Sequence, residues 1–329
     1  FSTAVVLVYI PTSNVKVFPF TMSTCYFFIF EKTFIDFVFL ESHQIATLTA
    51  ESYSVQKLDK TPVKAEVQQI DWNQISVAKG EYRHFMLKEI FEQPQSITNT
   101  LSGQIDFEHQ LIQLADMNLT EDKAKAIQRL VTVACGTSYY SGLVGKFYIE
   151  QLAKLYVEVD YGSEYRYRNP ILDKNSAVLA ITQSGETVDT LSAMEEATEK
   201  GSTVWSIVNN IGSQAMRLAD GYISMNAGPE IGVASTKAFT TSMVDQLLLG
   251  LYLGQLRGTL AESERVQAIK DIARLPDLVG QALGHNEAIL DLAHHLYKAK
   301  NRQISSIKGK KRYFRILELY RGKLKCVII

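Results

Sequence analysis

The chain has 329 residues, a formal net charge of −1 and a hydrophobic content of 46%. These values are typical of a globular protein with one large domain or two ordinary ones, and they give no argument for nucleic acid or a membrane as a partner. The three cysteines, Cys25, Cys135 and Cys326, match no spacing typical of a metal site or a disulfide framework. We therefore expect no metal site and a reducing compartment, the cytoplasm.

The beginning of the chain is rich in aromatic residues. Nine of the 15 phenylalanines lie in the first 40 residues. The apolar stretch Phe18–Phe30 is short for a membrane span, and Pro19 interrupts it. It also lacks the basic start and the cleavage site that are typical of a signal peptide. We therefore leave residues 1–37 unassigned.

The next segment, residues 38–60, reads as two strands. Val38–Thr47 and Tyr53–Leu58 have strand composition and are separated by a polar break. Two strands are too few to form a stable sheet alone. Residues 61–79 are polar and irregular, and we interpret them as a linker.

Apolar residues at helical spacing then predict three helices. The first is Tyr82–Gln93, which Pro94 is expected to end, and Phe107–Leu114 and Glu121–Leu130 follow. His84 lies on the first helix and could be a ligand or a base, but a lone histidine on such a helix is usually structural. These helices lead into the next domain.

From residue 130 onward, apolar strands alternate with helical segments. Strands that are separated by 10–20 residues of helix predict an α/β fold with a doubly wound, five-stranded parallel sheet. In such a sheet, ligands bind beyond the carboxyl ends of the strands. The predicted strands are Leu130–Ala134, Tyr156–Val159, Ala177–Ile181, Thr203–Val208 and Tyr222–Met225, and the main predicted helices are Tyr140–Leu155, a helix carrying Leu191, Met194 and Ala197, Gln214–Ala219 and Ala234–Leu256.

Three hydroxyl-rich segments follow strands of this sheet. They are Cys135–Ser138, Thr182–Thr187 and Val233–Thr236. A helix that starts after such a segment offers unpaired N–H groups and the positive end of its dipole to an anion, and hydroxyls add donors. Ser184 followed by Thr187 would also fit an ordinary helix N-cap with no ligand. Because the three segments converge at strand ends, we expect a small anionic ligand.

The pattern is not that of the usual nucleotide-binding folds. The first strand of the sheet is followed by no Gly-x-Gly-x-x-Gly, and the chain has no Gly-Lys-Ser/Thr loop. Hydroxyls and one glutamine, rather than Lys or Arg, suit a phosphate monoester that is held by neutral donors and main-chain N–H groups. We therefore expect a phosphorylated small molecule.

Four motifs together resemble one known family. Cys135–Ser138, Thr182–Thr187 and Glu230–Thr240 resemble the first sugar-isomerase (SIS) domain of the glutamine–fructose-6-phosphate aminotransferase family. Tyr82–Pro94 resembles the helix that precedes that domain. The motifs stand in the family's order over about Glu81–Gly258, which makes the resemblance highly specific.

The resemblance also implies a division of the chain into domains. Residues 38–60 look like the last strands of the family's glutaminase domain, and residues 80–258 look like the preceding helices with the first SIS domain. We expect residues 259–300 to be a helical connector. Residues 301–329 are a basic tail outside the family pattern, and we assign it no function.

The resemblance implies a phosphosugar site for fructose-6-phosphate or glucosamine-6-phosphate. The residues that match the family's phosphate-holding positions are Thr182, Gln183, Ser184, Thr187 and Ser138, those that match its sugar-lining positions are Cys135, Gly136 and Thr137, and those beside the open-chain sugar are Val233 and Ser235. Thr182 replaces a more frequent serine and keeps the hydroxyl. We interpret Cys135 as a lining residue rather than a nucleophile, and Glu186 and Lys237 as structural.

The family's catalytic residues have no match in this sequence. Its nucleophilic cysteine would be residue 1, which here is Phe1, and Arg302–Ile329 carry none of the motifs of a second SIS domain. We therefore expect a fragment that binds phosphosugar as a homodimer, with no catalytic residue, no cofactor, and neither nucleic acid nor a membrane as a partner. The alternatives are an SIS-family phosphosugar deaminase or deglycase, a sugar-phosphate-sensing regulator, and a structural remnant.

Overall fold

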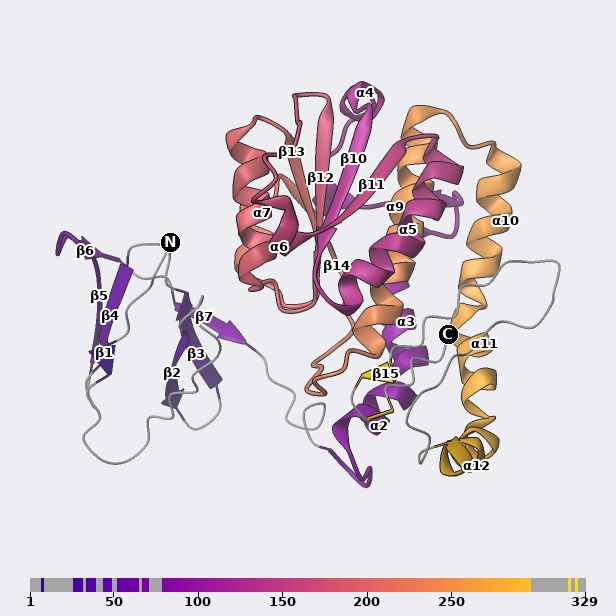
Figure 1. Cartoon of the computed structure of the whole chain (residues 1–329), viewed down its shortest axis with the longest axis horizontal. Helices are drawn as coiled ribbons and strands as arrows, with labels where there is room; N and C mark the ends of the chain where they lie inside the picture. The colour runs from indigo at the N-terminus through magenta and orange to yellow at the C-terminus, as the bar shows by residue number, and fades with distance from the viewer. Residues whose placement is uncertain are drawn as a thin grey trace. The chain divides into compact units, whose positions relative to one another are not determined.

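The computed structural model describes residues 7–8, 26–31, 34–39, 44–48, 52–64, 67–70, 79–296, 319–320 and 323–324. Its contacts divide the chain into two units, Phe1–Ala78 and Lys79–Ile329 (Figure 1). Each unit has its own β-sheets.

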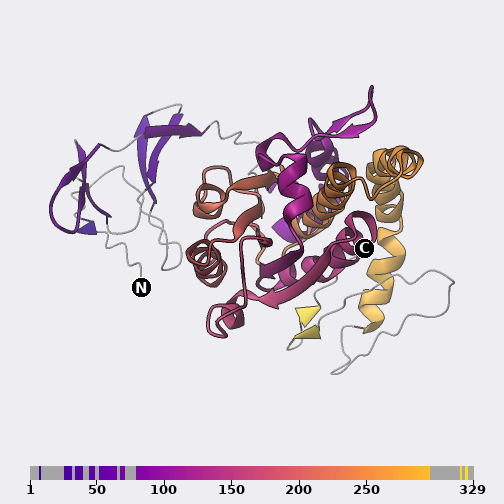
Figure 2. The same cartoon turned by 90° about the horizontal axis from the view of Figure 1, so that it is seen from above.

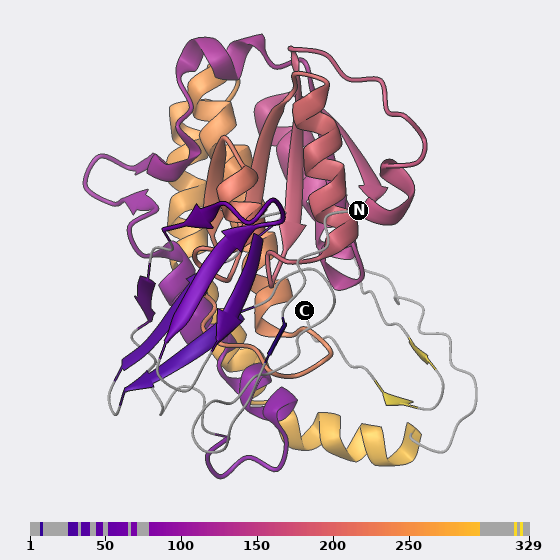
Figure 3. The same ribbon diagram turned by 90° about the vertical axis from the view of Figure 1, so that its left-hand side faces the viewer.

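The described part of the first unit contains two small sheets, whose strands are drawn in indigo and violet in Figure 3. In one of them β4 pairs antiparallel with β5, and this pairing places Ala46 opposite Val55, both of them buried. The sheet of order β1-β4-β5-β6 comprises Leu7–Val8, Gln44–Leu48, Tyr53–Lys57 and Pro62–Val63, and the sheet of order β2-β3-β7 comprises Tyr26–Glu31, Phe34–Phe39 and Val67–Ile70.

The sequence predictions for this unit are only partly confirmed. The strand at Tyr53–Leu58 is confirmed as β5. The single strand Val38–Thr47 is wrong, because its beginning belongs to β3 and its end to β4, which lie in different sheets. The interpretation of residues 61–79 as an irregular linker is wrong where β6 and β7 lie, since Val and Ile separated by polar residues form strands there.

The second unit begins with two helices in succession, α2 (Phe85–Phe91) and α3 (Gln93–Leu101). The predicted helix Tyr82–Gln93 is confirmed over its central part, but Pro94 does not end it. Pro94 instead lies in the first turn of α3, where a missing N–H and a fixed φ are well tolerated. The sequence prediction therefore missed α3.

A β-hairpin follows where a helix was predicted. Phe107–Leu114 is not helical, because β8 (Ile105–Asp106) pairs antiparallel with β9 (Leu111–Ile112). The Asp106 carboxylate accepts hydrogen bonds from the N–H groups of Glu108 and His109 at 3.0 and 2.9 Å, and these bonds turn the chain. This local bonding outweighs the helical spacing of a few apolar residues.

A short connection then leads into the main sheet. It contains the 3-10 helix η1 (Ala115–Met117) and α4 (Glu121–Ala126). The Oγ1 of Thr120 accepts the N–H of Lys123 at 3.3 Å and so caps α4. The predicted helix Glu121–Leu130 is confirmed only as far as Ala126, because its last residues enter the first strand of the sheet.

The predicted doubly wound sheet is confirmed. Its five strands pair in parallel in the order β11-β10-β12-β13-β14. Helices α5 and α9 cover one face, whereas α7 and α8 cover the other (Figure 2). The strands are β10 (Arg129–Ala134), β11 (Tyr156–Tyr161), β12 (Ser176–Thr182), β13 (Thr203–Val208) and β14 (Gly221–Ser224), and the helices are α5 (Thr137–Ala153), α6 (Gly162–Tyr165), α7 (Val188–Glu199), α8 (Gln214–Leu218) and α9 (Lys237–Arg257).

The strands are buried on both faces, and their residues alternate between two hydrophobic cores. In β10, Leu130 and Ala134 pack in the core beneath α5 and α9, whereas Val131 and Val133 pack beneath α7. Successive side chains of a strand point to opposite faces, so a continuous apolar run supplies both layers. This is why the sheet could be located from short apolar runs alone.

Three more helices follow the sheet: α10 (Glu262–Ala273), α11 (Leu275–Leu283) and α12 (Asn286–Leu296). They agree with the helical character predicted for residues 259–300 as far as the described residues extend. Of the basic segment 301–329, only β15 (Leu319–Tyr320) and β16 (Lys323–Leu324) are described. Among the helices that the structure describes, none has both the length and the apolar composition required to span a bilayer.

Helix α9 contains a carboxyl group in an unfavourable position. The side chain of Asp245 is fully buried, and neither of its carboxyl oxygens has a hydrogen-bond partner within the described residues. Burial therefore raises the pKa of Asp245 well above its usual value. A group whose pKa is raised on folding stabilises the protein below its unfolded-state pKa, and this contribution is lost as pH rises through the folded-state pKa.

We predict that Asp245→Asn stabilises the protein relative to the wild type as pH is raised from about 5 to about 9. The amide cannot ionise, so the free energy of unfolding of the variant should rise relative to that of the wild type as the pH passes through the raised pKa of Asp245. Urea unfolding at several pH values measures the difference. Asp271→Asn, at an exposed position on α10, is the matched control. A difference that is independent of pH would contradict the assignment.

Candidate functional site

The order of the strands fixes where a site can form. From β10 the chain crosses to β11 on one side, and it then returns to β12 on the other side. The crossovers therefore leave β10 and β12 in opposite directions, which makes the carboxyl ends of these two strands the switch point of the sheet. Ala134 pairs with Ile181 in register, so Cys135 and Thr182 follow directly at neighbouring strand ends.

A cavity of about 190 Å³ lies at this switch point. Nine of the ten residues that the sequence singles out line it, and only Gly136 does not. The lining residues are Cys135, Thr137, Ser138, Ile181, Thr182, Gln183, Ser184, Thr187, Thr190, Glu230, Gly232, Val233 and Ser235. Three segments that are distant in sequence thus form one concave surface rich in hydroxyl groups.

The turn between β12 and α7 forms the first wall. The Oγ1 of Thr182 accepts the N–H of Gly185 at 3.2 Å and lies 3.3 Å from the Oγ1 of Thr187. The Oγ of Ser184 accepts the N–H of Glu186 at 3.2 Å. The N-cap of α7 is Thr187, whose side chain makes no capping hydrogen bond. The interpretation of Ser184 as an ordinary N-cap is therefore wrong.

The turn between β10 and α5 forms the second wall. Its Gly136 has φ +60° and ψ −132°, a conformation that side chains disfavour, and it serves as the N-cap of α5. Gly136 thus shapes the turn, whereas Thr137 and Ser138 in the first helical turn line the cavity. The Sγ of Cys135 accepts a weak hydrogen bond from the Oγ1 of Thr190 at 3.9 Å.

The loop that connects β14 to α9 forms the third wall. It contributes Glu230, Gly232, Val233 and Ser235 to the cavity, and Val233 is fully exposed. Burial raises the pKa of Glu230, and the nearby charge of Glu89 raises it further, although hydrogen bonds oppose the shift. Glu230 is the only acid among the residues that line the cavity, and these residues include no lysine or arginine.

Two further charged residues were interpreted as structural from the sequence. Lys237 is 3% exposed, and its Nζ lies 2.7 Å from the Oε2 of Glu92. The Oε1 of Glu186 accepts the N–H of Gln214 at 3.0 Å. Neither residue is among those that line the cavity, and both contacts agree with a structural role.

Sequence reasoning missed four of the lining residues: Ile181, Thr190, Glu230 and Gly232. Thr190 lies three residues after Thr187, so the two share a face of the helix beginning, and this spacing could have identified it. Glu230 and Gly232 belong to a motif that was recognised, but their contact with the cavity depends on the path of the loop.

The arrangement suits an anionic ester of moderate size. Hydroxyl-bearing residues at the beginnings of α5 and α7 line the cavity. Hydroxyl groups and the main-chain N–H groups at the beginning of a helix can donate hydrogen bonds to phosphate oxygens. Within the described residues, no group of three or more His, Cys, Asp or Glu side chains is placed to hold a metal ion.

Comparison with known proteins agrees with this geometry. Residues 124–250 match the family model of the SIS domain. In the structure, the matched residues comprise the parallel sheet from β10 to β14 and most of α9, together with every residue that lines the cavity.

The sequence around the SIS domain resembles aminotransferases. The chain is 40% identical over 259 residues to the glutamine–fructose-6-phosphate aminotransferase of Symbiobacterium thermophilum, covering 79% of this chain and 42% of the relative. It is 41% identical over 257 residues to the enzyme of the same name from Mycobacterium leprae, covering 78% of this chain and 41% of the relative. The chain thus spans about two fifths of the length of these relatives.

A solved structure is similar as well. The C-terminal domain of glucosamine-fructose-6-phosphate aminotransferase from Francisella tularensis superimposes with a TM-score of 0.64 at 33% identity. The match covers 67% of this chain and 61% of that one. The resemblance that the sequence motifs indicated is therefore confirmed.

Gly185 offers a test of how tightly the β12–α7 turn is built. Its φ is +73°, and a Cβ at this position would lie 2.0 Å from the Oγ of Ser213. Gly201 has a similar φ of +74° but has no atom within 4 Å of such a Cβ. An alanine substitution at Gly201 therefore tests backbone strain alone, whereas one at Gly185 tests strain and steric overlap together.

We predict that Gly185→Ala lowers the free energy of unfolding by about 2–5 kcal/mol, because left-handed strain and overlap add. Gly201→Ala should cost only the strain of about 1–2 kcal/mol. Urea denaturation of both variants gives the comparison. Equal losses would show that the turn can shift to accommodate a methyl group.

Proposed function

We propose that this chain is the phosphosugar-binding part of a glutamine–fructose-6-phosphate aminotransferase, which makes glucosamine-6-phosphate from fructose-6-phosphate and glutamine. The observation that carries the proposal is the cavity at the switch point, where Ser138, Ser184 and Thr187 converge. The named relatives favour this enzyme over a deaminase, a deglycase or a transcription regulator.

Each predicted site residue receives a role in this proposal. Thr182, Gln183, Ser184 and Thr187 hold the phosphate together with Ser138. Cys135 and Thr137 line the sugar, Val233 and Ser235 lie beside its open chain, and Gly136 gives the turn its shape. The cavity that nine of these residues share supports the assignment.

The absence of a cation among the lining residues predicts modest affinity. A hydrogen bond to a charged acceptor contributes about 1.5–3 kcal/mol, so four such bonds give roughly 6–12 kcal/mol. Association costs about 4–15 kcal/mol in lost freedom. Phosphate contacts alone therefore bind weakly, and the sugar must contribute through the second and third walls.

The resemblance to the aminotransferases also suggests a domain assignment for the first strands and an oligomeric state. We propose that strands β4 and β5 correspond to the end of the family's glutaminase domain, and that the chain forms a homodimer through its SIS domain. The three scattered cysteines support a location in the cytoplasm. Analytical sedimentation tests the dimer.

Titration of the protein with fructose-6-phosphate, glucosamine-6-phosphate and unphosphorylated fructose tests the function. Calorimetry or NMR should detect binding of both phosphorylated sugars, whereas fructose should not bind because the phosphate contacts are missing. The absence of any response to millimolar phosphosugar in a folded sample would contradict the proposal.

We predict that replacing Ser184 and Thr187 together with alanine weakens fructose-6-phosphate binding by at least about tenfold. Two hydroxyl donors to a charged acceptor are lost, and about 1.4 kcal/mol corresponds to a factor of ten. Ser263→Ala removes an exposed hydroxyl of α10 and serves as the matched control. An unchanged affinity in the double variant would place the phosphate elsewhere.

A further inference from the structure

A row of buried polar side chains runs along α2 and α3, outside the residues that line the cavity. Glu89, Gln93, Ser96 and Thr100 are 2%, 5%, 3% and 0% exposed. Their spacings of four, three and four residues place them on one helical face, because the chain keeps helical dihedrals through Glu92, between the two helices. We call these four residues the α2–α3 polar row.

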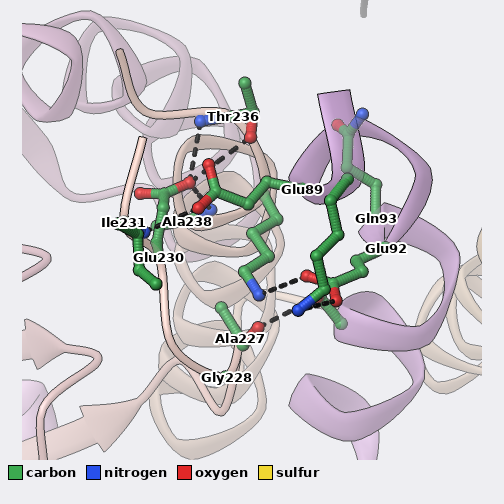
Figure 4. Close-up of polar contacts among 12 residues, drawn as sticks. Glu89, Glu92, Gln93, Ala227, Gly228, Glu230, Ile231, Thr236 and Ala238 are labelled. Carbon is green, nitrogen blue, oxygen red and sulfur yellow. Dashed lines mark hydrogen bonds and ion pairs between the residues drawn. The ribbon is translucent and has the colours of Figure 1, made fainter. Parts of the chain in front are cut away.

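Every member of the polar row bonds to the segment that connects β14 to α9 or to the beginning of α9. Figure 4 shows the part of this contact around Glu89, Glu92 and Gln93. The partners are the N–H groups of Ile231 and Gly232 for Glu89, the Oγ1 of Thr240 for Gln93, the carbonyl of Ala227 for Ser96 and the carbonyl of Met225 for Thr100. The third wall of the cavity is therefore held by helices that precede the sheet.

Within the row, only Glu89 bonds to a residue that lines the cavity. Its Oε1 accepts the N–H of Ile231 at 2.6 Å and that of Gly232 at 2.9 Å, and its Oε2 lies 3.2 Å from the Gly232 nitrogen. Within the described part of the chain, no lysine or arginine forms an ion pair with Glu89. Two main-chain N–H groups therefore compensate its charge, and such charge-assisted bonds are strong.

Gly232 is required for this approach. A Cβ at Gly232 would lie 2.4 Å from the Oε2 of Glu89 and 3.4 Å from the Cα of Met86. Any side chain at this position would push the carboxylate away from the loop. The glycine and the glutamate thus form a matched pair, although they are 143 residues apart in the chain.

A second carboxylate holds the other end of the loop. The Oε1 of Glu230 accepts the N–H groups of Thr236 and Ala238 at 2.8 and 3.2 Å. The loop is therefore fixed at Ile231 and Gly232 by Glu89, and near the beginning of α9 by Glu230. Between these anchors lie Val233 and Ser235, the two residues assigned to the open-chain sugar.

We infer that Glu89 is a positioning residue of the phosphosugar site: its carboxylate fixes the loop at Ile231 and Gly232 and thereby sets where Val233 and Ser235 meet the sugar. The inference rests on the proposed function. The inference concerns the sugar end of the ligand and not its phosphate end, because no member of the polar row bonds to the phosphate-holding residues. Loss of Glu89 should therefore affect recognition of the sugar and leave recognition of the phosphate group intact.

Glu89→Gln tests the inference with an isosteric side chain. The amide keeps one acceptor oxygen, but it presents an NH₂ group where a second oxygen faces Gly232, and it has no charge. We expect faster amide hydrogen exchange at Ile231 and Gly232 in the unliganded protein. The Kd for fructose-6-phosphate should rise about tenfold, whereas the Kd for inorganic phosphate should stay the same.

Two further variants sharpen the test. Glu81→Gln removes the same charge at an exposed position just before α2 and should change none of these quantities. Gly232→Ala disturbs the same contact from the loop side. The double variant with Glu89→Gln should bind fructose-6-phosphate no more weakly than the poorer single variant, because both changes break one interaction.

These measurements distinguish a failure of the role of Glu89 from a failure of the proposed function. Unchanged exchange at Ile231 and Gly232 in Glu89→Gln would overturn the role of Glu89. Faster exchange with an unchanged Kd for fructose-6-phosphate would overturn it too, as would an equal weakening of fructose-6-phosphate and inorganic phosphate. A wild-type protein that binds neither ligand would overturn the proposed function, and the exchange rates would still report whether Glu89 holds the loop.

Discussion

The site depends on one constraint of parallel sheets, which is that strands running in the same direction deliver all their carboxyl ends to one edge. At the boundary between β10 and β12 the crossovers diverge, so the helices α5 and α7 begin on opposite faces and leave space between their first turns. The first main-chain N–H groups of a helix have no partner within the helix, so two helix beginnings place such groups near each other whatever the side chains are. The hydroxyls of Ser138, Ser184 and Thr187 add to a polarity that the fold already provides.

Because the fold itself supplies hydrogen-bond donors at this edge of the sheet, the cavity can be polar although no lysine or arginine lines it. A lysine or arginine would bind a phosphate group more strongly than hydroxyl groups do. Under the proposed function, neutral donors at the strand ends recognise the phosphate with modest affinity, and the β14–α9 loop contributes the remaining selectivity. Met225 and Ala227 at the beginning of this loop are buried, but Ile231 is 46% exposed and Val233 is fully exposed. The conformation of the loop therefore depends on the carboxylates of Glu89 and Glu230, which bond to its main chain.

The parts of the fold that the sequence predicted correctly are those in which burial and local pattern agree. Strands β12 and β13 are mostly apolar and almost wholly buried, and their predicted ends lie within one residue of the observed ends. The hairpin at residues 105–112 was missed because the Asp106 carboxylate, rather than apolar spacing, determines the turn. Most lining residues were found because they lie in motifs at strand ends. Glu89 was missed because its partner lies far away in the chain, and a polar residue on an amphipathic helix usually faces water.

The α2–α3 polar row also bears on where this domain begins. The residues that match the SIS family model start at 124, some 35 positions after Glu89. A protein cut to the family boundaries would keep the whole sheet and every lining residue. It would, however, expose the carbonyls of Met225 and Ala227 and would leave Lys237 without Glu92. The part of the chain that matches the SIS family model is thus smaller than the part whose hydrogen bonds hold the cavity's third wall in place, and a recombinant protein is better started before α2.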